Sequence, residues 1–193
     1  MRFTLFAAVS LVLGILFAQG TRAETNIVTG CGVDGCGEPS PYQEARAAYE
    51  NGDYAEAAKN LKRLEAWAKA GHKGAQELLG IMYRYGHGVP KDSKKAFAFL
   101  LQAAEAKKPL AEYHLAAMYY SGEGVQPNPS IALMWVHIAL VHFDEGPEKQ
   151  QAAQSRDDMY AHTKRREKDR ACQMAVEWLI KKGEGGLAET LCR

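Results

Sequence analysis

The sequence predicts an all-α fold, an α-solenoid of stacked helix-turn-helix repeats that follows an N-terminal signal peptide. Three observations predict this fold. The chain opens on an apolar run, one block of residues recurs at a spacing of 36 residues, and apolar residues elsewhere recur three and four positions apart. The sequence lacks segments with the alternating pattern of a β-strand, so we expect helices throughout.

Residues 1–23 have the pattern of a cleavable signal peptide. Arg2 supplies a positive charge, residues 3–18 form an apolar run, and Ala23 stands before the expected cleavage point. The run is shorter than the roughly 20 residues that a membrane-spanning helix needs. We therefore expect a periplasmic or secreted protein with no membrane span after cleavage. An uncleaved anchor, or a lipid on Cys31 of the sequence VTGC, is the alternative.

All four cysteines follow the expected cleavage point: Cys31, Cys36, Cys172 and Cys192. An even number of cysteines in an exported chain indicates disulfides. The first two stand in a Gly- and Cys-containing segment, residues 24–40, and the last two would tie a tail, residues 183–193, to a long helix. We favour these two local pairings because short loops cost the least entropy to close, and the other pairings stay open. Neither pair has the spacing of a zinc or thioredoxin-like site, so no metal site is expected.

A 36-residue unit repeats within residues 41–182. Shifting the chain by 36 residues places Leu79 on Leu115, and the sequence GHGV at 86–89 on the sequence GEGV at 122–125. An earlier copy is weaker because its turn is five residues shorter. A single helix pair cannot bury its own apolar face, so the units must stack. We expect units at residues 41–71, 72–107 and 108–143, and a divergent capping pair at 147–182.

Local signals set the expected helix boundaries. Ser40, Pro41 and Gln43 form a capping box with proline at the first helical position. Asp92 and Asn128 are equivalent N-caps in the second and third units, and Thr163 would cap the last long helix. The expected helices span residues 41–51, 54–70, 74–85, 93–106, 109–121, 129–142, 147–162 and 164–182.

At these residues the chain resembles the Sel1-like repeat family, relatives of the tetratricopeptide repeats. The stretch AQELLGIMYRYGHGVPKDSKKAFAFLLQAAE, residues 75–105, matches the family pattern A-x3-LG-x2-Y-x2-G-x-GV and its aspartate-capped second helix. Residues 111–139 match with Ala116 replacing the glycine and Asn128 replacing the aspartate. The first unit lacks the Gly-x-Gly-Val turn and looks more like a tetratricopeptide. The resemblance implies a bacterial scaffold or adaptor that holds proteins in complexes, and many such bacterial proteins act in the cell envelope.

The sequence shows no catalytic, cofactor or metal motif. The Gly-x-Gly loops follow helices and lack the strand, the third glycine and the Gly-Lys-Ser/Thr of nucleotide sites, so we interpret them as turns with left-handed glycines. The motifs His-Glu-x-x-His and Gly-x-Ser-x-Gly are absent. A net charge of +1 gives no basic excess for nucleic acid. We therefore expect a protein that is not an enzyme, with no cofactor and no nucleic-acid partner.

The expected working surface is the concave groove of the solenoid. In tetratricopeptide-type stacking, the groove is faced by positions two before, and two, five and six after, the leucines Leu79 and Leu115. On this basis we predict five partner-binding residues: Glu77, Arg84, Tyr85, Tyr113 and Tyr120. Tyrosine and arginine are favoured at interfaces, although these tyrosines could instead fill gaps between repeats. The predicted function is a scaffold that binds an envelope protein or peptide, and the alternative is a cell-wall-directed protein that binds or acts on peptidoglycan fragments.

Overall fold

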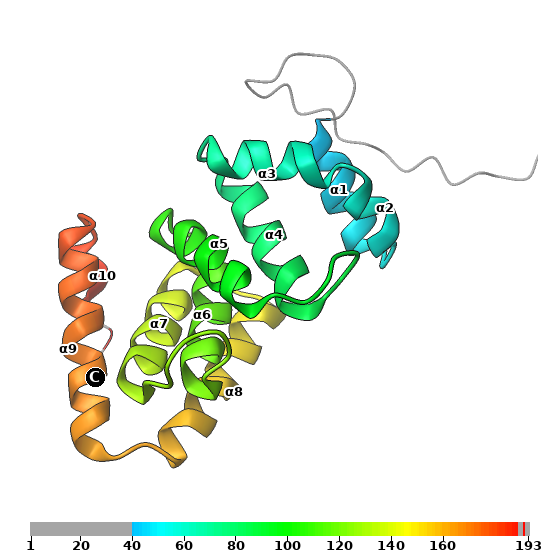
Figure 1. The fold of residues 1–193 in the computed structure, drawn as a ribbon. Helices are drawn as coiled ribbons and strands as arrows, with labels where there is room; N and C mark the ends of the chain where they lie inside the picture. The colour runs from blue at the N-terminus through cyan, green and yellow to red at the C-terminus, as the bar shows by residue number, and fades with distance from the viewer. Residues whose placement is uncertain (1–39, 189–190, 192–193) are drawn as a thin grey trace, which may run out of the picture. The chain divides into compact units, whose positions relative to one another are not determined.

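The computed structural model describes residues 40–188 and 191. The expected signal peptide, Cys31, Cys36 and Cys192 lie outside the described residues. Within them the chain is helical and contains no strand (Figure 1). The helices are α1 (Pro41–Glu50), α2 (Tyr54–Lys59), α3 (Leu61–Lys69), α4 (Lys73–Tyr85), α5 (Ser93–Glu105), α6 (Pro109–Ser121), α7 (Pro129–His142), α8 (Pro147–Ala161), α9 (Arg165–Lys181) and α10 (Gly185–Ala188).

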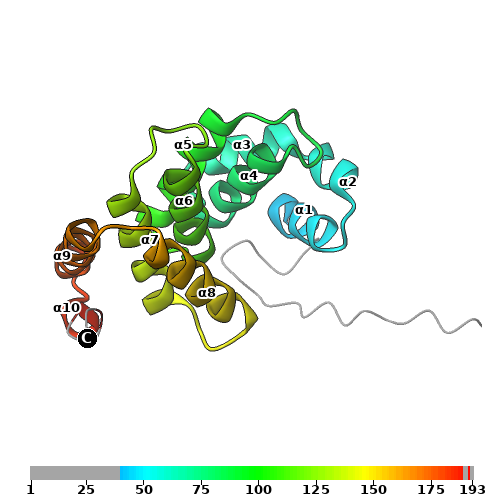
Figure 2. The same cartoon turned by 90° about the horizontal axis from the view of Figure 1, so that it is seen from below.

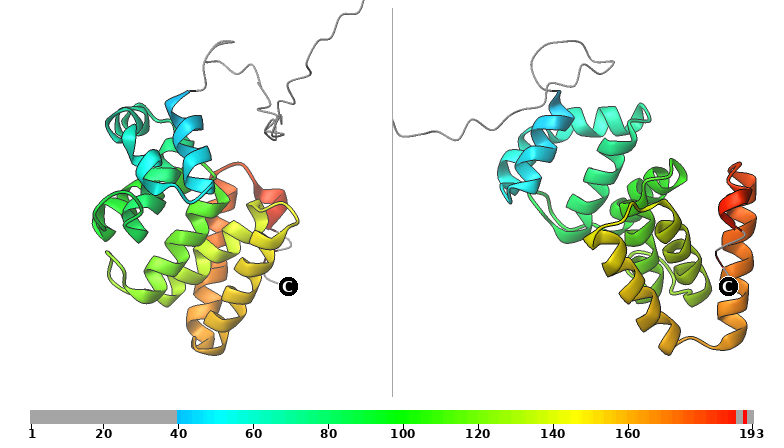
Figure 3. Two further views of the ribbon diagram at one scale, coloured as in Figure 1. Left: turned by 90° about the vertical axis from the view of Figure 1, so that its right-hand side faces the viewer. Right: turned by 180° about the vertical axis from the view of Figure 1, so that it is seen from behind.

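The helices pack in chain order as stacked hairpins. The most extensive contacts join α4 to α5 and α6 to α7, and α5 in turn packs on α6. Helix α7 then packs on both α8 and α9. Figure 2 and Figure 3 show that α8 and α9 meet at their connecting turn and diverge on either side of α7. The predicted all-α repeat fold is therefore confirmed.

The predicted caps appear at the helix starts. The Ser40 side chain accepts from the backbone N–H of Gln43, and the Gln43 side chain accepts from the backbone N–H of Ser40, which completes the capping box. The Asp92 side chain accepts from the N–H groups of Lys94 and Lys95 at the start of α5. The Asn128 side chain accepts from the N–H of Ile131 at the start of α7.

The two Gly-x-Gly loops are turns, as their sequence context predicts. Gly86 and Gly122 follow α4 and α6 with the same left-handed φ of 76°. Gly88 and Gly124 also have positive φ, and each lies against the start of the second helix in the preceding unit. A Cβ on Gly88 would stand 2.1 Å from the carbonyl oxygen of Tyr54, and a Cβ on Gly124 would stand 2.4 Å from that of Ser93. Only glycine fits these contacts between units.

The core runs along the interior of the stack. Small residues let helices approach, as at Gly80 of α4, where a Cβ would stand 2.6 Å from Leu100 of α5. Large apolar side chains fill the remaining space between the layers. The largest fully buried ones are Leu64, Leu79, Met82, Leu100, Leu115, Met118, Leu133, Ile138, Leu179 and Val136.

Two predicted boundaries are wrong. The helix expected over residues 54–70 is broken at Asn60, whose side-chain amide donates to Glu44 of α1 at 3.0 Å. Thr163 does not cap α9, because its buried hydroxyl donates to the Met159 carbonyl of α8 at 2.7 Å. Lys164 takes the N-cap position instead, and its N–H donates to the Glu167 side chain.

Cys172 is the one cysteine in the part of the chain that the structure describes, and it is not a free thiol. Its predicted partner lies outside that part, so both disulfide pairings stay predictions. Across residues 40–188, no helix is long and apolar enough to cross a membrane.

Candidate partner-binding face

The five predicted partner-binding residues lie on α4 and α6, the first helices of two consecutive units, but they differ in burial. Glu77, Arg84 and Tyr85 stand on α4, and Tyr113 and Tyr120 stand on α6. The side chains of Glu77 and Arg84 are buried, whereas Tyr85 is 49% exposed and Tyr120 is 39% exposed. The expectation that both charged residues present their side chains to the groove is therefore not met.

Arg84 is occupied by contacts within the fold. Its Nε donates to Glu123 Oε2 at 3.1 Å, and its Nη1 donates to Nδ1 of the buried His114 at 2.7 Å. Burial, reinforced by the Arg84 charge, lowers the pKa of His114 to about 3, so the ring stays neutral and can accept this bond. Although burial raises the pKa of the Glu123 carboxyl, hydrogen bonds from Lys91 and Arg84 outweigh it and leave that pKa lowered. Arg84 thus joins α4 to α6 and to the following Gly-x-Gly loop.

Glu77 is likewise held inside the fold. Its Oε2 lies 3.3 Å from Nζ of Lys108, which stands just before α6. Burial raises the pKa of the Glu77 carboxyl, although the Lys108 charge opposes this. The pair links α4 to the turn between α5 and α6, so Glu77 positions these helices.

The three tyrosines differ in how free their side chains are. The Tyr113 hydroxyl lies 2.9 Å from the Ser155 hydroxyl of α8, so this half-buried residue fastens α6 to α8. Tyr85 presents about half of its surface to solvent, with the Arg84 guanidinium 5.2 Å from its ring centre. Tyr85 and Tyr120 are therefore the exposed aromatic groups on the predicted face.

An aromatic cluster that the sequence did not reveal surrounds Tyr85. His87, the middle residue of the first Gly-x-Gly loop, stacks on Tyr85 at 5.4 Å and on Tyr54 at 3.9 Å between ring centres. Its Nδ1 lies 2.8 Å from the Tyr49 hydroxyl. Burial raises the pKa of Tyr49 to about 12, which keeps that hydroxyl protonated and able to donate. The sequence signal for this cluster was weak, since an aromatic residue between two turn glycines suggests only a surface loop.

A small cleft opens beside this cluster, between α1, α4 and the start of α6. Its volume is about 130 Å³, which is the scale of one aliphatic or aromatic side chain. The walls are mostly apolar, and the Arg46 guanidinium at the rim donates to the Tyr42 hydroxyl at 2.9 Å and to Glu50 at 2.7 Å. The lining residues are Tyr42, Arg46, Tyr49, Glu50, Gly74, Glu77, Leu78, Ile81 and Leu110. Of the predicted site residues, this cleft includes Glu77.

A second, larger cleft is lined by residues of α7, α8 and α9, and its volume is about 720 Å³. Nε2 of His137 lies 2.7 Å from the Tyr160 hydroxyl, and Nζ of Lys168 lies 5.1 Å from the centre of the Tyr160 ring. Burial, reinforced by the Arg156 charge, lowers the pKa of His137 to about 4. The remaining lining residues are mostly charged or polar: Arg156, Asp157, Asp169, Cys172, Gln173 and Leu191.

Among residues 40–188 and 191, no cluster of histidine, cysteine, aspartate or glutamate could hold a metal ion. The face around Tyr85 and Tyr120 carries exposed aromatic surface.

Comparison with known proteins agrees with this fold. The family model of the Sel1 repeat matches residues 74–108 and 109–140, which correspond to the second and third predicted units. Among solved structures, a protective antigen of uropathogenic Escherichia coli that displays an SLR fold has a TM-score of 0.68 at 22% identity, over 78% of this chain and 32% of the antigen. A Sel1 repeat protein from Oxalobacter formigenes has a TM-score of 0.49 at 22% identity, over 73% of this chain and 61% of that protein.

The chain spans about a third of the antigen and less than two thirds of the second protein. At these identities the likeness shows the fold alone. The family match, together with the likeness in fold to the antigen, confirms the predicted resemblance to Sel1-like repeats.

Proposed function

The chain carries two Sel1 repeats, and from them we propose that it is a non-catalytic adaptor of the bacterial cell envelope or periplasm that binds a protein or peptide partner. Sel1 repeat proteins generally act in protein–protein interaction. The apolar N-terminal run and the four cysteines support a location outside the cytoplasm, where disulfides persist.

One observation carries the proposed binding role, the exposed aromatic face around Tyr85. Tyr85 and Tyr120 are exposed large side chains on α4 and α6, and the apolar cleft beside Tyr49 is of the size that one anchoring side chain would fill. Aromatic anchors next to a small pocket are typical of the residues that dominate binding energy. Arg84 contributes indirectly, because it holds the helices that carry this face, whereas Glu77 both holds α4 to the turn before α6 and lines the cleft.

The proposed adaptor function is tested by capture from envelope extract with a Tyr85→Ala/Tyr120→Ala double variant. Both side chains are exposed, so we expect the fold to be kept and the captured partner to be lost. Ile180→Ala on α9 is the matched control, since Ile180 is 59% exposed and lies on another helix. Unchanged capture by the double variant, or equal loss with the control, would show that this face is not the binding surface.

The larger cleft, lined by residues of α7, α8 and α9, favours a second candidate function, the binding of peptidoglycan fragments. Its volume of about 720 Å³ is in the range of ligand sites, and its mixed charges suit a fragment with both sugar and peptide groups. Calorimetry with soluble muropeptides, comparing the purified protein with Lys168→Ala, separates the two. Muropeptide binding that depends on Lys168, with no protein captured, would replace the adaptor proposal.

A further inference from the structure

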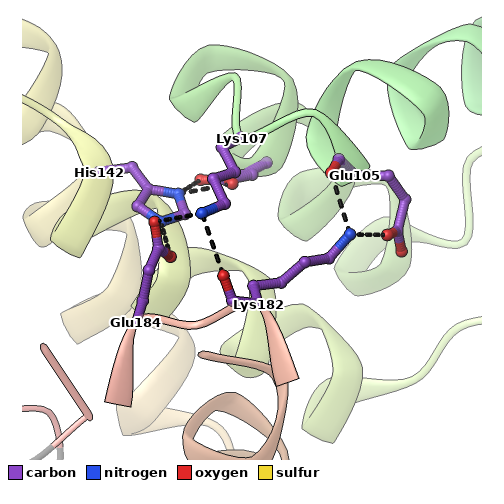
Figure 4. Close-up of polar contacts among 6 residues, drawn as sticks. Glu105, Lys107, His142, Lys182 and Glu184 are labelled. Carbon is purple, nitrogen blue, oxygen red and sulfur yellow. Dashed lines mark hydrogen bonds and ion pairs between the residues drawn. The ribbon is translucent and has the colours of Figure 1, made fainter. Parts of the chain in front are cut away.

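Six charged or titratable side chains meet where the turn between α9 and α10 reaches the repeats. Figure 4 shows this cluster, in which His142 of α7 lies between groups that are far apart in the sequence. The cluster joins the ends of α5, α7 and α9, the turn before α6, and α6 itself. Its members are Glu105, Lys107, Glu112, His142, Lys182 and Glu184.

The imidazole of His142 contacts a carboxylate at each of its nitrogens. Nδ1 lies 2.7 Å and 2.9 Å from the two carboxylate oxygens of Glu112, and Nε2 lies 2.9 Å from Oε2 of Glu184. The Glu112 side chain is fully buried, and the His142 side chain is 9% exposed. The Glu184 side chain is 19% exposed, so water has little access to the Glu112 contact and more access to the Glu184 contact.

These contacts require one proton more than the three groups ordinarily carry at neutral pH. An ionised carboxylate only accepts hydrogen bonds, and a neutral imidazole donates at one nitrogen alone. Both bonds are made if the imidazole is doubly protonated, or if Glu112 is protonated and donates to Nδ1 while Nε2–H donates to Glu184. Both arrangements hold the same total number of protons. When that proton leaves, an unprotonated nitrogen faces a carboxylate and one bond is lost.

We propose that His142, Glu112 and Glu184 form a proton-dependent latch that fastens the C-terminal turn to the third repeat. The latch is closed while the three side chains share the additional proton, and it opens when the proton is lost. Glu184 is the moving member, because it stands in the short turn between α9 and α10, whereas Glu112 and His142 stand on helices of the repeat.

The other charges around the latch are accounted for. Lys107 Nζ lies 2.7 Å from Glu184 Oε1 and 3.3 Å from the Lys182 carbonyl, so Lys107 neutralises one charge of the turn. Lys182 Nζ lies 2.6 Å from Glu105 Oε2. On the side of α4, the Glu77 carboxylate adds to the negative charge near Glu112 and is paired with Lys108. Lys107 Nζ contacts Glu184 and the Lys182 carbonyl, Lys182 Nζ contacts Glu105, and none of these contacts involves the His142 ring.

The pH direction follows from the surroundings of each group. Burial lowers the pKa of His142, but the hydrogen bonds to Glu112 and Glu184 outweigh it and leave the pKa raised above its ordinary 6.5. Burial also raises the pKa of Glu112. Both shifts favour the proton-bound latch, whose stabilisation is complete below the ordinary histidine pKa and is lost as the pH rises through the raised value. The pKa of the Glu184 carboxyl is lowered, so Glu184 is protonated, and its stabilisation of the latch is lost, only in acid.

The latch contacts the end of α9 and lies close to Trp178, and both can be observed in solution. The Glu184 N–H donates to the Leu179 carbonyl of α9 at 2.8 Å, so release of Glu184 loosens the end of that helix. The Trp178 ring centre lies 6.0 Å from that of His142 and 5.6 Å from that of Trp135, and Lys182 Nζ lies 5.2 Å from it. Opening of the latch therefore changes the environment of Trp178.

The test is a pH titration of the purified protein from about pH 5 to about pH 9, across the ordinary histidine pKa. We expect the ring resonances of His142, identified by their loss in His142→Gln, to titrate above 6.5. Backbone order of residues 183–188, measured by ¹⁵N relaxation, should change with the same midpoint. So should the combined fluorescence of the adjacent pair Trp135 and Trp178, measured in a Trp67→Phe background. Titration of His142 at or below the ordinary value, or order that does not follow it, overturns the proposal.

Two carboxamide variants make the test independent of whether His142→Gln folds. In Glu184→Gln, the new amide donates to Nε2 while Nδ1–H donates to Glu112, so a neutral imidazole satisfies both contacts and the alkaline step should disappear. Glu105→Gln weakens the Lys182 pair in the same cluster without touching His142, so the step should persist at its wild-type midpoint. A step that survives in Glu184→Gln, or that vanishes in Glu105→Gln, contradicts the latch.

Discussion

The two Gly-x-Gly loops have the same backbone, but their middle residues contact the preceding unit through different chemistry. In both loops the first glycine donates its N–H to a methionine carbonyl at 2.9 Å, Met82 in one and Met118 in the other. In both, the cap residue of the next helix donates to a tyrosine carbonyl at 2.9 Å, Tyr83 or Tyr119. The repeated sequence thus encodes a repeated joint.

The middle residue is where the loops differ. His87 stacks on the Tyr54 ring and lies 2.8 Å from the Tyr49 hydroxyl of the first unit. Glu123 accepts from Arg84 at 3.1 Å and pairs with Lys91 at 2.8 Å in the second unit. The glycines therefore bring consecutive units together, and the residue between them decides whether aromatic contacts or charge holds the junction.

The largest loss of stability is expected from Gly88→Ala, which disrupts the close contact between units that both loops share. A Cβ there would stand 2.1 Å from the Tyr54 carbonyl oxygen, at a φ of +71°. We expect a loss of about 3 kcal/mol or more in the free energy of unfolding, since strain and a backbone clash act together. Gly124→Ala, at 2.4 Å from Ser93, should behave similarly. Chemical denaturation measures both.

Gly52→Ala is the matched control for the joint. Gly52 has a φ of +80°, but a Cβ there would meet nothing within 4 Å. The substitution should cost only the left-handed backbone penalty, about 1 kcal/mol. If Gly88→Ala costs no more than Gly52→Ala, close packing between units does not explain the second glycine.

The next largest effect is a loss of stability in acid at the charged junction, where His114 contacts Arg84, and it distinguishes this junction from the aromatic one. His114 stays neutral in the folded protein with a pKa of about 3, against an ordinary 6.5. Below pH 6.5 the His114 ring is protonated in the unfolded chain but stays neutral in the folded chain. The free energy of unfolding therefore falls as the pH falls toward 3. At pH 5 this amounts to about 2 kcal/mol. His114→Gln keeps an acceptor for Arg84 and should flatten the acid side of a stability-against-pH curve.

Part of that acid sensitivity should remain in His114→Gln. His137, whose pKa of about 4 is also lowered by burial, contributes in the same direction. The free energy of unfolding of the wild type and of the variant could instead change in parallel between pH 7 and about pH 4. That result would show that His114 is protonated without cost, so the buried Arg84 contact would not depend on a neutral ring.

Helices and turns were predictable because their signals are local. Asp92 and Asn128 cap from adjacent residues, and Gly86 and Gly122 end helices for reasons contained in a single turn. The repeat spacing of 36 residues then fixed which elements stack. Asn60 is an exception, because the contact to Glu44 that accompanies the break comes from another helix.

Exposure was not predictable from the position in the repeat. Arg84 and Tyr120 are 36 residues apart in the sequence and occupy equivalent positions, yet Arg84 is 9% exposed and Tyr120 is 39% exposed. Arg84 meets Glu123 in the loop of the next unit, whereas the divergent pair that follows α6 and α7 has no Gly-x-Gly loop to supply such a partner. Contacts that join residues so far apart leave no local signal.

A smaller effect is expected from Glu123→Gln, which keeps the shape of the charged junction and removes its charge. The Glu123 side chain is 21% exposed. Removing its charge should lower the free energy of unfolding by about 1–2 kcal/mol, as for hydrogen bonds to charged groups. Because its pKa is lowered, the contribution is present above the ordinary carboxyl value and is lost as the pH falls through the lowered one. The difference between wild type and variant should therefore shrink in acid and in high salt. A difference independent of both would exclude the ion pair as its source.

The smallest effect is expected from His87→Ala at the aromatic junction. The substitution removes the stacks on Tyr54 and Tyr85, at 3.9 Å and 5.4 Å between ring centres, and leaves the Tyr49 hydroxyl without its 2.8 Å contact. These partly exposed ring contacts and one neutral hydrogen bond predict a loss of about 1 kcal/mol. Because neither contact joins opposite charges, this loss should not change with salt, unlike that of Glu123→Gln. Denaturation at low and high ionic strength measures both variants, and a salt-dependent loss in His87→Ala would mean that this junction, too, is held by charge.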